Sequence, residues 1–284
     1  VPDASVGAPP DQYTQQGQDW SQPPWNPQQL AEFGYAPWRD LLRTVLRHSG
    51  GIRVDHVLGL FRLFWLPRTA TPAHGAYMNY DFEAMLGTLV LEAERAGAVV
   101  VGEDLGTFEP WVQDELRDKG VLGTSVLWFE SVPPEMPRPS QQYRNLALTA
   151  VGTHDLPPTA GYLKGAHNEL RHTLGLVDAT VDELNAADKV WIDQVIDLAR
   201  AEGELTDDIV EGLTRFVAST PSAMTCTNLV DMVGDERIQN LPGTNGEQYA
   251  NWRMPLCDGT GAPVLIEDLE QVELFVRLAE ASKR

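Results

Sequence analysis

The stretch Ala98-Val99-Val100-Val101-Gly102-Glu103-Asp104 is an apolar run that ends in a glycine and two carboxylates. A continuous run of this kind is typical of a strand buried on both faces of a parallel sheet. The carboxylates then lie at the carboxyl end of the strand, where α/β-barrel enzymes keep their catalytic residues. This stretch therefore predicts a parallel sheet with chemistry at one edge.

Strand-like and helix-like segments alternate on both sides of this run. Strands are expected at residues 52–57, 124–129, 146–151 and 223–229. Helices are expected at residues 28–48, 82–95, 109–119, about 164–218 and 267–282. Asp81 is the expected N-cap of the second helix, and Pro37 predicts a kink or a division in the first. Strands that alternate with helices predict βαβ units and a parallel sheet.

The charge balance points away from polyanionic partners. The 284 residues include 21 basic and 41 acidic side chains, for a formal net charge of -20. Nucleic acids and anionic membranes require a basic patch, so neither is an expected partner, whereas a neutral sugar is compatible. No apolar run of 18 residues predicts a membrane span. Cys226 and Cys257 lack a metal-type spacing, so we expect reduced thiols and a cytoplasmic location, with one disulfide as the alternative.

Asp55 lies inside a predicted strand, in the sequence Arg53-Val54-Asp55. Because side chains alternate along a strand, Arg53 and Asp55 are expected on the same face, where the guanidinium can keep the carboxylate ionised. An ionised and oriented carboxylate can act as a nucleophile. The alternative is a purely structural ion pair at the end of the strand.

Glu103 and Asp155 also follow apolar runs. A carboxyl group at the mouth of an apolar strand can have a raised pKa, which suits Glu103 to general-acid catalysis; the alternative is a helix cap. Pro157-Pro158 ends regular structure after Asp155, so His154 and Asp155 are expected at the same edge, or Asp155 begins a turn. Three carboxylates at the ends of strands predict one shared site.

At these residues the chain resembles glycoside hydrolase family 77, the 4-α-glucanotransferases also called amylomaltases or disproportionating enzymes. The sequence is most similar to those of the actinobacterial members, and the resemblance covers nearly the whole chain. Each motif is short, but their order and spacing are specific. They are Gly7-Ala8-Pro9-Pro10-Asp11, Gly17-Gln18-Asp19-Trp20, Arg53-Val54-Asp55-His56, Gly102-Glu103-Asp104-Leu105-Gly106, Thr153-His154-Asp155, Asn240-Leu241-Pro242-Gly243-Thr244 and Asn251-Trp252-Arg253.

The resemblance implies a role for each candidate residue. Asp55 would be the nucleophile, Glu103 the general acid and base, and Asp155 the carboxylate that stabilises the transition state. The implied substrate-binding residues are Arg53, His154, Asp11, Tyr13, Gln18, Trp20 and Asn240. The implied reaction is the transfer of α-1,4-glucan segments between maltooligosaccharides by retaining double displacement, without a cofactor or a metal. Retaining pairs stand about 5 Å apart, which is the separation expected for Asp55 and Glu103.

The implied fold is the C-terminal part of a (β/α)8 TIM barrel, about strands 4–8 with helical insertions, over residues 1–284. Residues 1–27 would be an active-site loop, and about 164–218 a helical insertion. A complete barrel has eight strands, so the missing N-terminal part of the same enzyme is a further expected partner. Activity of the chain alone would then depend on that partner.

Two other functions fit parts of this pattern. A hydrolase of the α-amylase clan would use the same three carboxylates and release its products to water. A catalytically silent binding or scaffold protein could share the fold, although such proteins usually lack one of the carboxylates. A nucleotide-binding enzyme is disfavoured because no glycine-rich phosphate loop is present.

Overall fold

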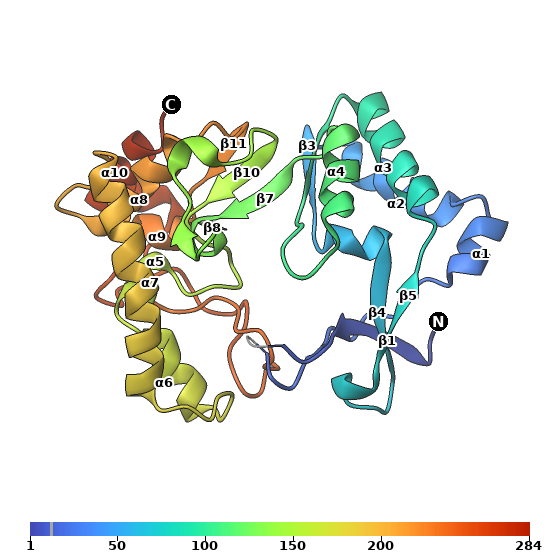
Figure 1. Ribbon diagram of the computed structural model, residues 1–284, viewed down its shortest axis with the longest axis horizontal. Coiled ribbons are helices and arrows are strands. Elements are labelled where there is room, and N and C mark those ends of the chain that lie inside the picture. Colours follow the sequence, from blue (N-terminus) through green and yellow to red (C-terminus); the bar gives the residue numbers. More distant parts are fainter. Residues whose placement is uncertain (12–13) are drawn as a thin grey trace. The chain divides into compact units, whose positions relative to one another are not determined.

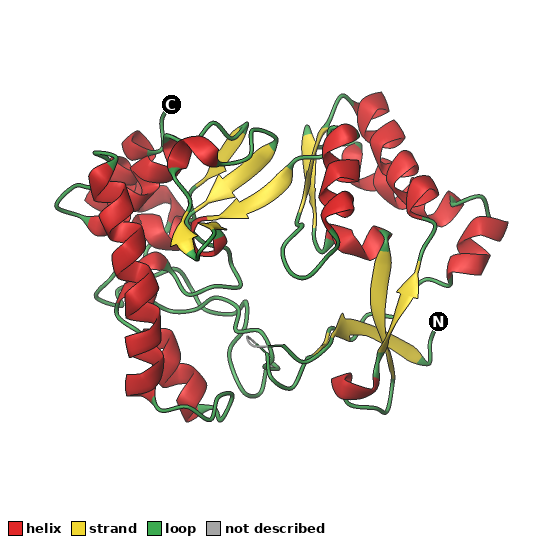
Figure 2. Ribbon diagram, viewed as in Figure 1, coloured by secondary structure: helices red, strands yellow, loops and turns green. Residues whose placement is uncertain are grey.

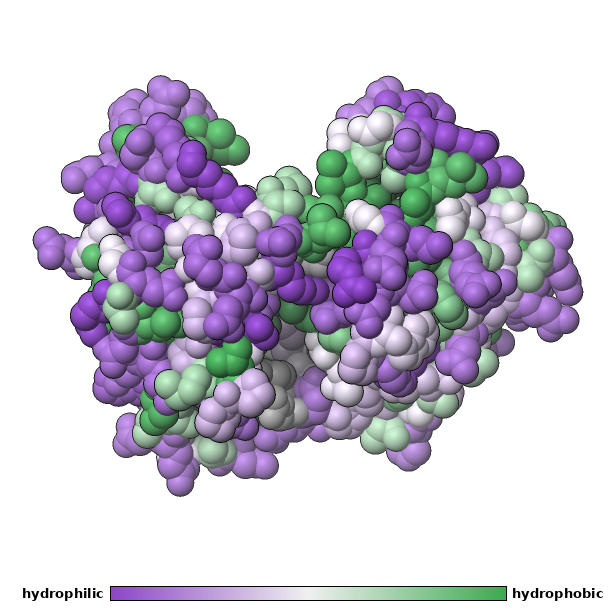
Figure 3. All heavy atoms as spheres, turned by 45° about the horizontal axis from the view of Figure 1, so that its top comes forward, coloured by the Kyte–Doolittle hydropathy of each residue, from purple (hydrophilic) through white to green (hydrophobic). Residues whose placement is uncertain are grey.

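The computed structural model describes residues 1–11 and 14–284 and divides into two compact units, Val1–Thr124 and Ser125–Arg284. Helices and strands occur in both units (Figures 1 and 2). Hydrophilic residues cover most of the face shown in Figure 3, which agrees with the strongly acidic composition. Within the described residues, no helix is long and apolar enough to cross a membrane.

The first unit contains a pair of parallel strands. Strand β3 (Gly51–Val54) pairs in parallel with β6 (Val99–Gly102), and Val101 forms a further parallel bridge to Leu122. Both strands were predicted, but the strand expected at 52–57 ends at Val54, and Val57 begins a 3-10 turn. The helices of this unit are α1 (Pro27–Glu32), α2 (Ala36–Leu46), α3 (Phe82–Ala96) and α4 (Pro110–Asp118), with 3-10 turns η1 (Val57–Leu60) and η2 (Pro72–His74).

The helix boundaries follow local chemistry. The carboxylate of Asp81 accepts a hydrogen bond from the backbone N–H of Ala84, which confirms the predicted N-cap of α3. The segment 28–48 is divided into two helices, as predicted, but the break lies before Pro37. Tyr35 has a left-handed φ of 57°, and Pro37 occupies the first turn of α2, where a missing N–H costs little. Helices α2 and α3 pack together through buried Leu42, Leu46 and Leu89.

Residues 1–27 are not a continuous loop, and the prediction of one is wrong in this respect. Strands β1 (Ala4–Ala8) and β2 (Gln18–Asp19) join β4 (Arg62–Pro67) and β5 (Ala76–Asn79) in an antiparallel sheet of order β2-β1-β4-β5. The register pairs Gly7 with Asp19, and a Cβ on Gly7 would lie 1.9 Å from the carbonyl oxygen of Gln18. Only glycine therefore permits this close pairing.

The second unit contains a three-stranded sheet of order β11-β10-β7. Strand β7 (Gly123–Val126) starts in the first unit, β10 (Ala147–Ala150) follows, and β11 (Met224–Cys226) pairs in parallel with β10. A small antiparallel pair joins β8 (Ser131–Val132) and β9 (Met136–Pro137). The helices are α5 (Thr159–Leu163), α6 (Ala166–Thr173), α7 (Val181–Ala201), α8 (Ile209–Ala218), α9 (Leu229–Val233) and α10 (Glu273–Ala281), with 3-10 turns η3 (Leu127–Phe129), η4 (Ser140–Gln142) and η5 (Ile266–Gln271).

All three strands of this sheet were predicted, but each one ends earlier in the chain than expected. The strand expected at 124–129 ends at Val126 and continues as η3, and the strand expected at 223–229 ends at Cys226. The helical segment 164–218 is confirmed as α6, α7 and α8. The final helix is shorter than expected, because residues 266–271 form η5 before α10 begins. Helix α10 packs on α8 and α9, with Leu278 fully buried.

Candidate active site

The pairing of β3 with β6 places two of the predicted catalytic residues at adjacent backbone positions. Val54 pairs with Gly102, so Asp55 and Glu103 are the next residues of two adjacent parallel strands. The backbone N–H of Glu103 donates to the carbonyl of Val54, and the N–H of Val57 donates to the carbonyl of Glu103, both at 2.9 Å. The pairing therefore continues through the two candidate catalytic residues and fixes their backbones to each other.

Gly102 is needed at the end of β6. A Cβ at this position would lie 2.9 Å from Cγ1 of Val57, a side chain that is fully buried. Any larger residue would push the start of η1 away from the strand. The glycine before Glu103 thus keeps the segment after Asp55 packed closely against the strand that carries Glu103.

Asp55 is accessible and is held by Arg53. The Arg53 Nη1 atom lies 2.5 Å from Asp55 Oδ1, so the two side chains meet as predicted, although β3 ends at Val54 and Asp55 follows it rather than lying inside it. The Asp55 side chain is 70% exposed and that of Arg53 is 34% exposed. An ion pair this open leaves one side of the carboxylate free to meet a ligand, and it is not the buried pair that a purely structural role would suggest.

Glu103 has a different environment from Asp55. Its carboxylate accepts hydrogen bonds from the backbone N–H groups of Leu105 at 2.7 Å and His56 at 3.0 Å. Burial raises its pKa and the nearby Asp55 charge raises it further, while the Leu105 and His56 N–H groups and Arg53 act in the opposite direction. The net result is a raised pKa, as predicted. Glu103 does not cap the next helix, because Glu109 is the N-cap residue of α4.

Trp20 contacts His56, the residue after Asp55, and Gln18 is hydrogen-bonded to Trp20. The Trp20 ring lies edge-on to the His56 ring with centroids 5.2 Å apart, and Trp20 Nε1 donates to Oε1 of Gln18 at 3.1 Å. His56 has a left-handed backbone with a φ of 45°. Burial lowers the pKa of its imidazole, against the opposing effect of Asp55. Sequence reasoning assigned His56 no role of its own, although it stands in the Arg53-Val54-Asp55-His56 motif.

Asp11 follows β1 and precedes β2. The Asp11 carboxylate accepts from the backbone N–H of Thr14 at 2.6 Å and from its hydroxyl at 3.1 Å. Gln18 Nε2 in turn donates to the Thr14 hydroxyl at 3.4 Å, which links this turn to Gln18. The predicted binding residue Tyr13 lies outside the described residues.

The second unit brings together the other three predicted residues. Asn240 Nδ2 donates to Oδ1 of Asp155 at 2.6 Å, and His154 Nε2 lies 3.2 Å from Oδ2. The Thr153 hydroxyl accepts from the Asp155 N–H at 3.2 Å and orders the backbone after β10. Asn240 and Asp155 are 85 residues apart in sequence, so the fold rather than local spacing creates this contact.

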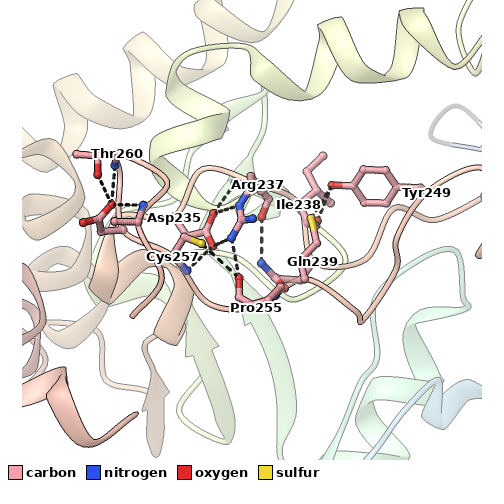
Figure 4. Close-up of polar contacts among 11 residues, drawn as sticks. Asp235, Arg237, Ile238, Gln239, Tyr249, Pro255, Cys257 and Thr260 are labelled. Carbon is pink, nitrogen blue, oxygen red and sulfur yellow. Dashed lines mark hydrogen bonds and ion pairs between the residues drawn. The ribbon is translucent and has the colours of Figure 1, made fainter. Parts of the chain in front are cut away.

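A buried carboxylate anchors the loop that carries Asn240 (Figure 4). Asp235 is 1% exposed; it accepts from Nε and Nη2 of Arg237 and from the backbone N–H of Cys257. Burial alone would raise the pKa of Asp235, but the Arg237 bonds hold it below its usual value. Arg237 also donates to the carbonyl of Pro255, and the Tyr249 hydroxyl donates to that of Ile238. The loop is therefore fixed on both sides of Asn240.

Trp252 is a further candidate that sequence reasoning did not assign to the site. Its ring centroid lies 5.1 Å from that of His154, and the residue is 63% exposed with a left-handed φ of 61°. The Trp252 N–H donates to the carbonyl of Gln239, next to Asn240. The motif Asn251-Trp252-Arg253 was the available signal, but nothing in its spacing indicated contact with His154.

Asp231 helps to fix the backbone segment that contains His154 and Asp155. Its carboxylate is buried and accepts from the backbone N–H and the hydroxyl of Thr159, at 2.6 and 3.0 Å. Burial raises the pKa of Asp231 to about 6, although the Thr159 and Asn228 bonds oppose this. Asn228 also donates to the carbonyl of Gly152 at 3.0 Å. These contacts hold both ends of the segment that includes His154 and Asp155.

Each of the two units holds its own group of carboxylate, amide and aromatic side chains. An open, arginine-paired carboxylate and a buried carboxyl of raised pKa follow neighbouring strands of the first unit. The second unit presents a carboxylate bound by an amide and a histidine. Among the described residues, no group of three or more His, Cys, Asp or Glu side chains is arranged to hold a metal ion.

Comparison with known proteins agrees with this chemistry. The family model described as 4-alpha-glucanotransferase, glycoside hydrolase family 77, matches residues 1–259. The 4-alpha-glucanotransferase of Mycobacterium tuberculosis (strain H37Rv) is 49% identical over 292 positions, covering 98% of this chain and 40% of that protein. The 4-alpha-glucanotransferase of Haemophilus influenzae is 34% identical over 263 positions, covering 88% of this chain and 37% of that protein. The chain thus spans about two fifths of the length of these relatives.

Solved structures confirm the fold class. The crystal structure of amylomaltase from Corynebacterium glutamicum is 58% identical with a TM-score of 0.94, covering 99% of this chain and 42% of that chain. Amylomaltase from Streptococcus agalactiae in complex with acarbose is 20% identical with a TM-score of 0.73, covering 99% of this chain and 50% of that chain, and shows the fold alone. The predicted α/β fold, part of a (β/α)8 barrel, is therefore confirmed.

Proposed function

This chain belongs to the 4-alpha-glucanotransferases of glycoside hydrolase family 77, and we propose that the protein transfers α-1,4-glucan segments between maltooligosaccharides. The observation that carries the proposal is the contrast between two carboxylates at the ends of adjacent strands. Asp55 is open and paired with Arg53, whereas Glu103 is buried with a raised pKa. Two carboxyl groups whose environments differ in this way are suited to separate nucleophile and acid roles.

In the proposed first step, Asp55 attacks the anomeric carbon of the donor glucan while Glu103 gives its proton to the glycosidic oxygen. The bond between that carbon and oxygen breaks, one glucan leaves as an alcohol, and the other remains on Asp55 as a glycosyl ester. Arg53 keeps the nucleophile oriented through its 2.5 Å contact. A separation of about 5 Å between the two carboxyl groups remains a prediction of this retaining scheme.

In the second step, the ionised Glu103 takes the proton from a hydroxyl group of the acceptor glucan. The acceptor oxygen attacks the anomeric carbon, and Asp55 leaves as a free carboxylate. The nucleophile and the acid are both restored, and the new glycosidic bond has the same configuration as the old one. No redox partner, metal or organic cofactor takes part in this scheme.

The remaining predicted residues are proposed to hold the sugar. Asp155 would bind hydroxyl groups and stabilise the positive charge that develops at the anomeric carbon, with Asn240 and His154 fixing its orientation. Trp20 would stack on a glucosyl ring and Gln18 would bind hydroxyls, with Asp11 and Tyr13 in the same segment. Trp252 is added because its ring meets that of His154.

Two segments of the chain have proposed roles, and a cellular location is proposed as well. We keep residues 1–27 as an active-site segment, now with β1 and β2 inside it, and residues 164–218 as a helical insertion. A cytoplasmic location is supported by two cysteines that are both free, Cys226 and Cys257.

Incubation of the protein with maltotriose tests the proposal. Transfer predicts glucose together with maltooligosaccharides longer than the substrate. These products should be lost in Glu103→Gln and kept in Glu94→Gln, which alters an exposed carboxylate on α3 in the same unit. Glucose and maltose without longer products would instead favour the hydrolase, and equal transfer by Glu103→Gln would contradict the assignment of the acid.

A further inference from the structure

A pocket of about 380 Å³ opens on the first unit, apart from the residues assigned to the reaction. One wall comes from η1 and the start of β4, with Phe61 and Arg62, and another from residues 107–112, with Glu109 and Trp111. The described residues that line it include none of the three candidate carboxylates. Its size lies within the range of about 300–1,000 Å³ that small-ligand sites occupy.

Three aromatic rings form a fixed platform in this pocket. Phe61 and Phe82 stack with centroids 5.0 Å apart and planes 14° from parallel. Trp111 meets Phe61 edge-on at 5.6 Å and Phe82 at 5.3 Å. Phe61 is 7% exposed, Phe82 is partly buried and Trp111 is 46% exposed, so the stacked pair supports an indole that presents much of its surface to solvent. A large, rigid ring with a polar N–H is suited to ligand contact at a small cost in side-chain entropy.

The polar rim of the pocket is held in place and carries no net charge. Arg62 Nη1 bonds Oε1 of Glu109 at 3.0 Å, Nη2 donates to the carbonyl of Thr107 at 3.3 Å, and the guanidinium lies 4.7 Å from the centroid of the Tyr77 ring. Arg62 and Glu109 are the charged side chains that line the pocket, and they offset each other. In a chain of net charge -20, such a rim favours neither an anion nor a cation.

We propose that this pocket is a second binding site for α-1,4-glucan, separate from the site of transfer. A glucosyl ring has an apolar C–H face that can lie on the indole of Trp111. Its hydroxyl groups can reach the guanidinium of Arg62, the carboxylate of Glu109 and the amide of Asn79, which also lines the pocket. A neutral, hydroxyl-rich ligand with one apolar face matches both the platform and the rim. The choice of glucan rests on the proposed function.

The pocket lies a few residues after each catalytic strand. Phe61 follows Asp55 by six residues, and Thr107 follows Glu103 by four. A glucan bound here would be held near the unit that carries the nucleophile and the acid. A second contact raises the effective concentration of the same chain at the first site, so long glucans should benefit and short ones should not.

Electrophoresis of the whole protein through native gels with and without soluble starch tests the inference. Trp111→Ala should reduce retardation by starch, with an affinity loss of about five- to tenfold, as expected for one aromatic contact. Trp111→Phe should lie between that variant and the wild type. Phe33→Ala is the matched control, because Phe33 is a 67% exposed aromatic residue of the same unit outside the pocket. Melting temperatures show whether each variant is folded.

The outcomes separate this inference from the proposed function. Weaker retardation of folded Trp111→Ala, with Phe33→Ala unchanged, supports the site whatever the maltotriose assay shows. Equal retardation of the wild type and folded Trp111→Ala overturns it, as does a wild type that starch does not retard. If Trp111→Ala is unfolded, the retardation of Trp111→Phe is compared with that of the wild type instead, and the same two outcomes support or overturn the site. Absence of transfer with retardation that depends on Trp111 would contradict the proposed function alone.

Discussion

The backbone N–H of His56, the residue directly after Asp55, donates a hydrogen bond of 3.0 Å to Oε2 of Glu103. This bond ties the backbone next to the proposed nucleophile to the side chain of the proposed acid. The pairing of β3 and β6 also joins their main chains, so the positions of the two groups depend on each other. Changes at either strand should therefore affect both steps of the reaction.

The first prediction concerns Arg53. Arg53→Lys keeps the positive charge but loses the rigid guanidinium fork, so Asp55 should be less well oriented. We expect kcat to fall about 10- to 100-fold with little change in KM, since small misplacements of a catalytic group cost rates of this order. Steady-state kinetics on maltotriose measures the split. Arg39→Lys on α2, where Arg39 pairs with exposed Asp40, is the control, and an equal loss there would point to a general effect on stability.

The second prediction concerns the titration of Glu103. Burial raises its pKa above 4.5, so the group stays protonated in the folded protein at pH values where the unfolded chain has lost the proton. Activity that needs the acid should fall as the pH rises through the raised pKa. Arg53→Ala removes a charge that lowers this pKa, so Glu103 should titrate at still higher pH. Carboxyl carbon NMR of labelled glutamate follows the shift, and a lower value in Arg53→Ala would contradict it.

The third prediction concerns the contact between Asn240 and Asp155. Asn240→Ala removes the 2.6 Å hydrogen bond to Oδ1 of Asp155. Hydrogen bonds to charged groups are worth about 1.5–3 kcal/mol, so kcat/KM should fall by about tenfold or more. Gln271→Ala, at an exposed position of η5 in the same unit, should behave like the wild type. Unchanged kinetics in Asn240→Ala would remove Asn240 from the site.

The fourth prediction concerns the pH dependence of stability that Asp231 causes. Its pKa is raised from 3.8 to about 6 by burial, so between these values the folded state holds a proton that the unfolded state has released. Stability should therefore fall as the pH rises through this window, by up to about 3 kcal/mol for a shift of 6 − 3.8 = 2.2. Asp231→Asn cannot ionise and should lack this fall.

Urea unfolding at pH 4, 5, 6 and 7 checks that prediction. The difference in unfolding free energy between Asp231→Asn and the wild type should grow in favour of the variant as the pH rises. Asp268→Asn is a suitable control, since Asp268 is an exposed residue of η5 and no comparable trend is expected. Parallel pH profiles for the wild type and Asp231→Asn would show that Asp231 is not responsible.

The sequence predicted those features of the fold that depend on local patterns of residues. Apolar runs located β3, β6, β10 and β11, which pair in parallel, and the alternation of side chains correctly placed Arg53 beside Asp55. The antiparallel sheet was missed because β1 lies in a segment rich in glycine, proline and glutamine, and β5 is exposed along its whole length. Its pairing of residues 4–8 with 62–67 is a long-range contact that no local period reveals.

The site was predicted only in part, because local patterns reveal some of its residues and long-range contacts determine the others. Residues at the ends of apolar runs were found because burial and charge stand next to each other in the sequence there. The backbone bond from His56 to Glu103 and the meeting of Trp252 with His154 depend on turns with positive φ at His56 and Trp252. Neither residue type signals such a conformation, so these contacts required the structure.

The pairing of β1 with β2 changes the thermodynamics of the segment proposed to hold the sugar. With Ala8 paired to Gln18, the connection between the strands is nine residues long, residues 9–17, and not the 27 of an unpaired loop. Loop-closure entropy grows with the logarithm of length, so this threefold shortening lowers the closure cost by about 1 kcal/mol. Part of the order that sugar binding would otherwise impose on Gln18 and Trp20 is already present in the free protein.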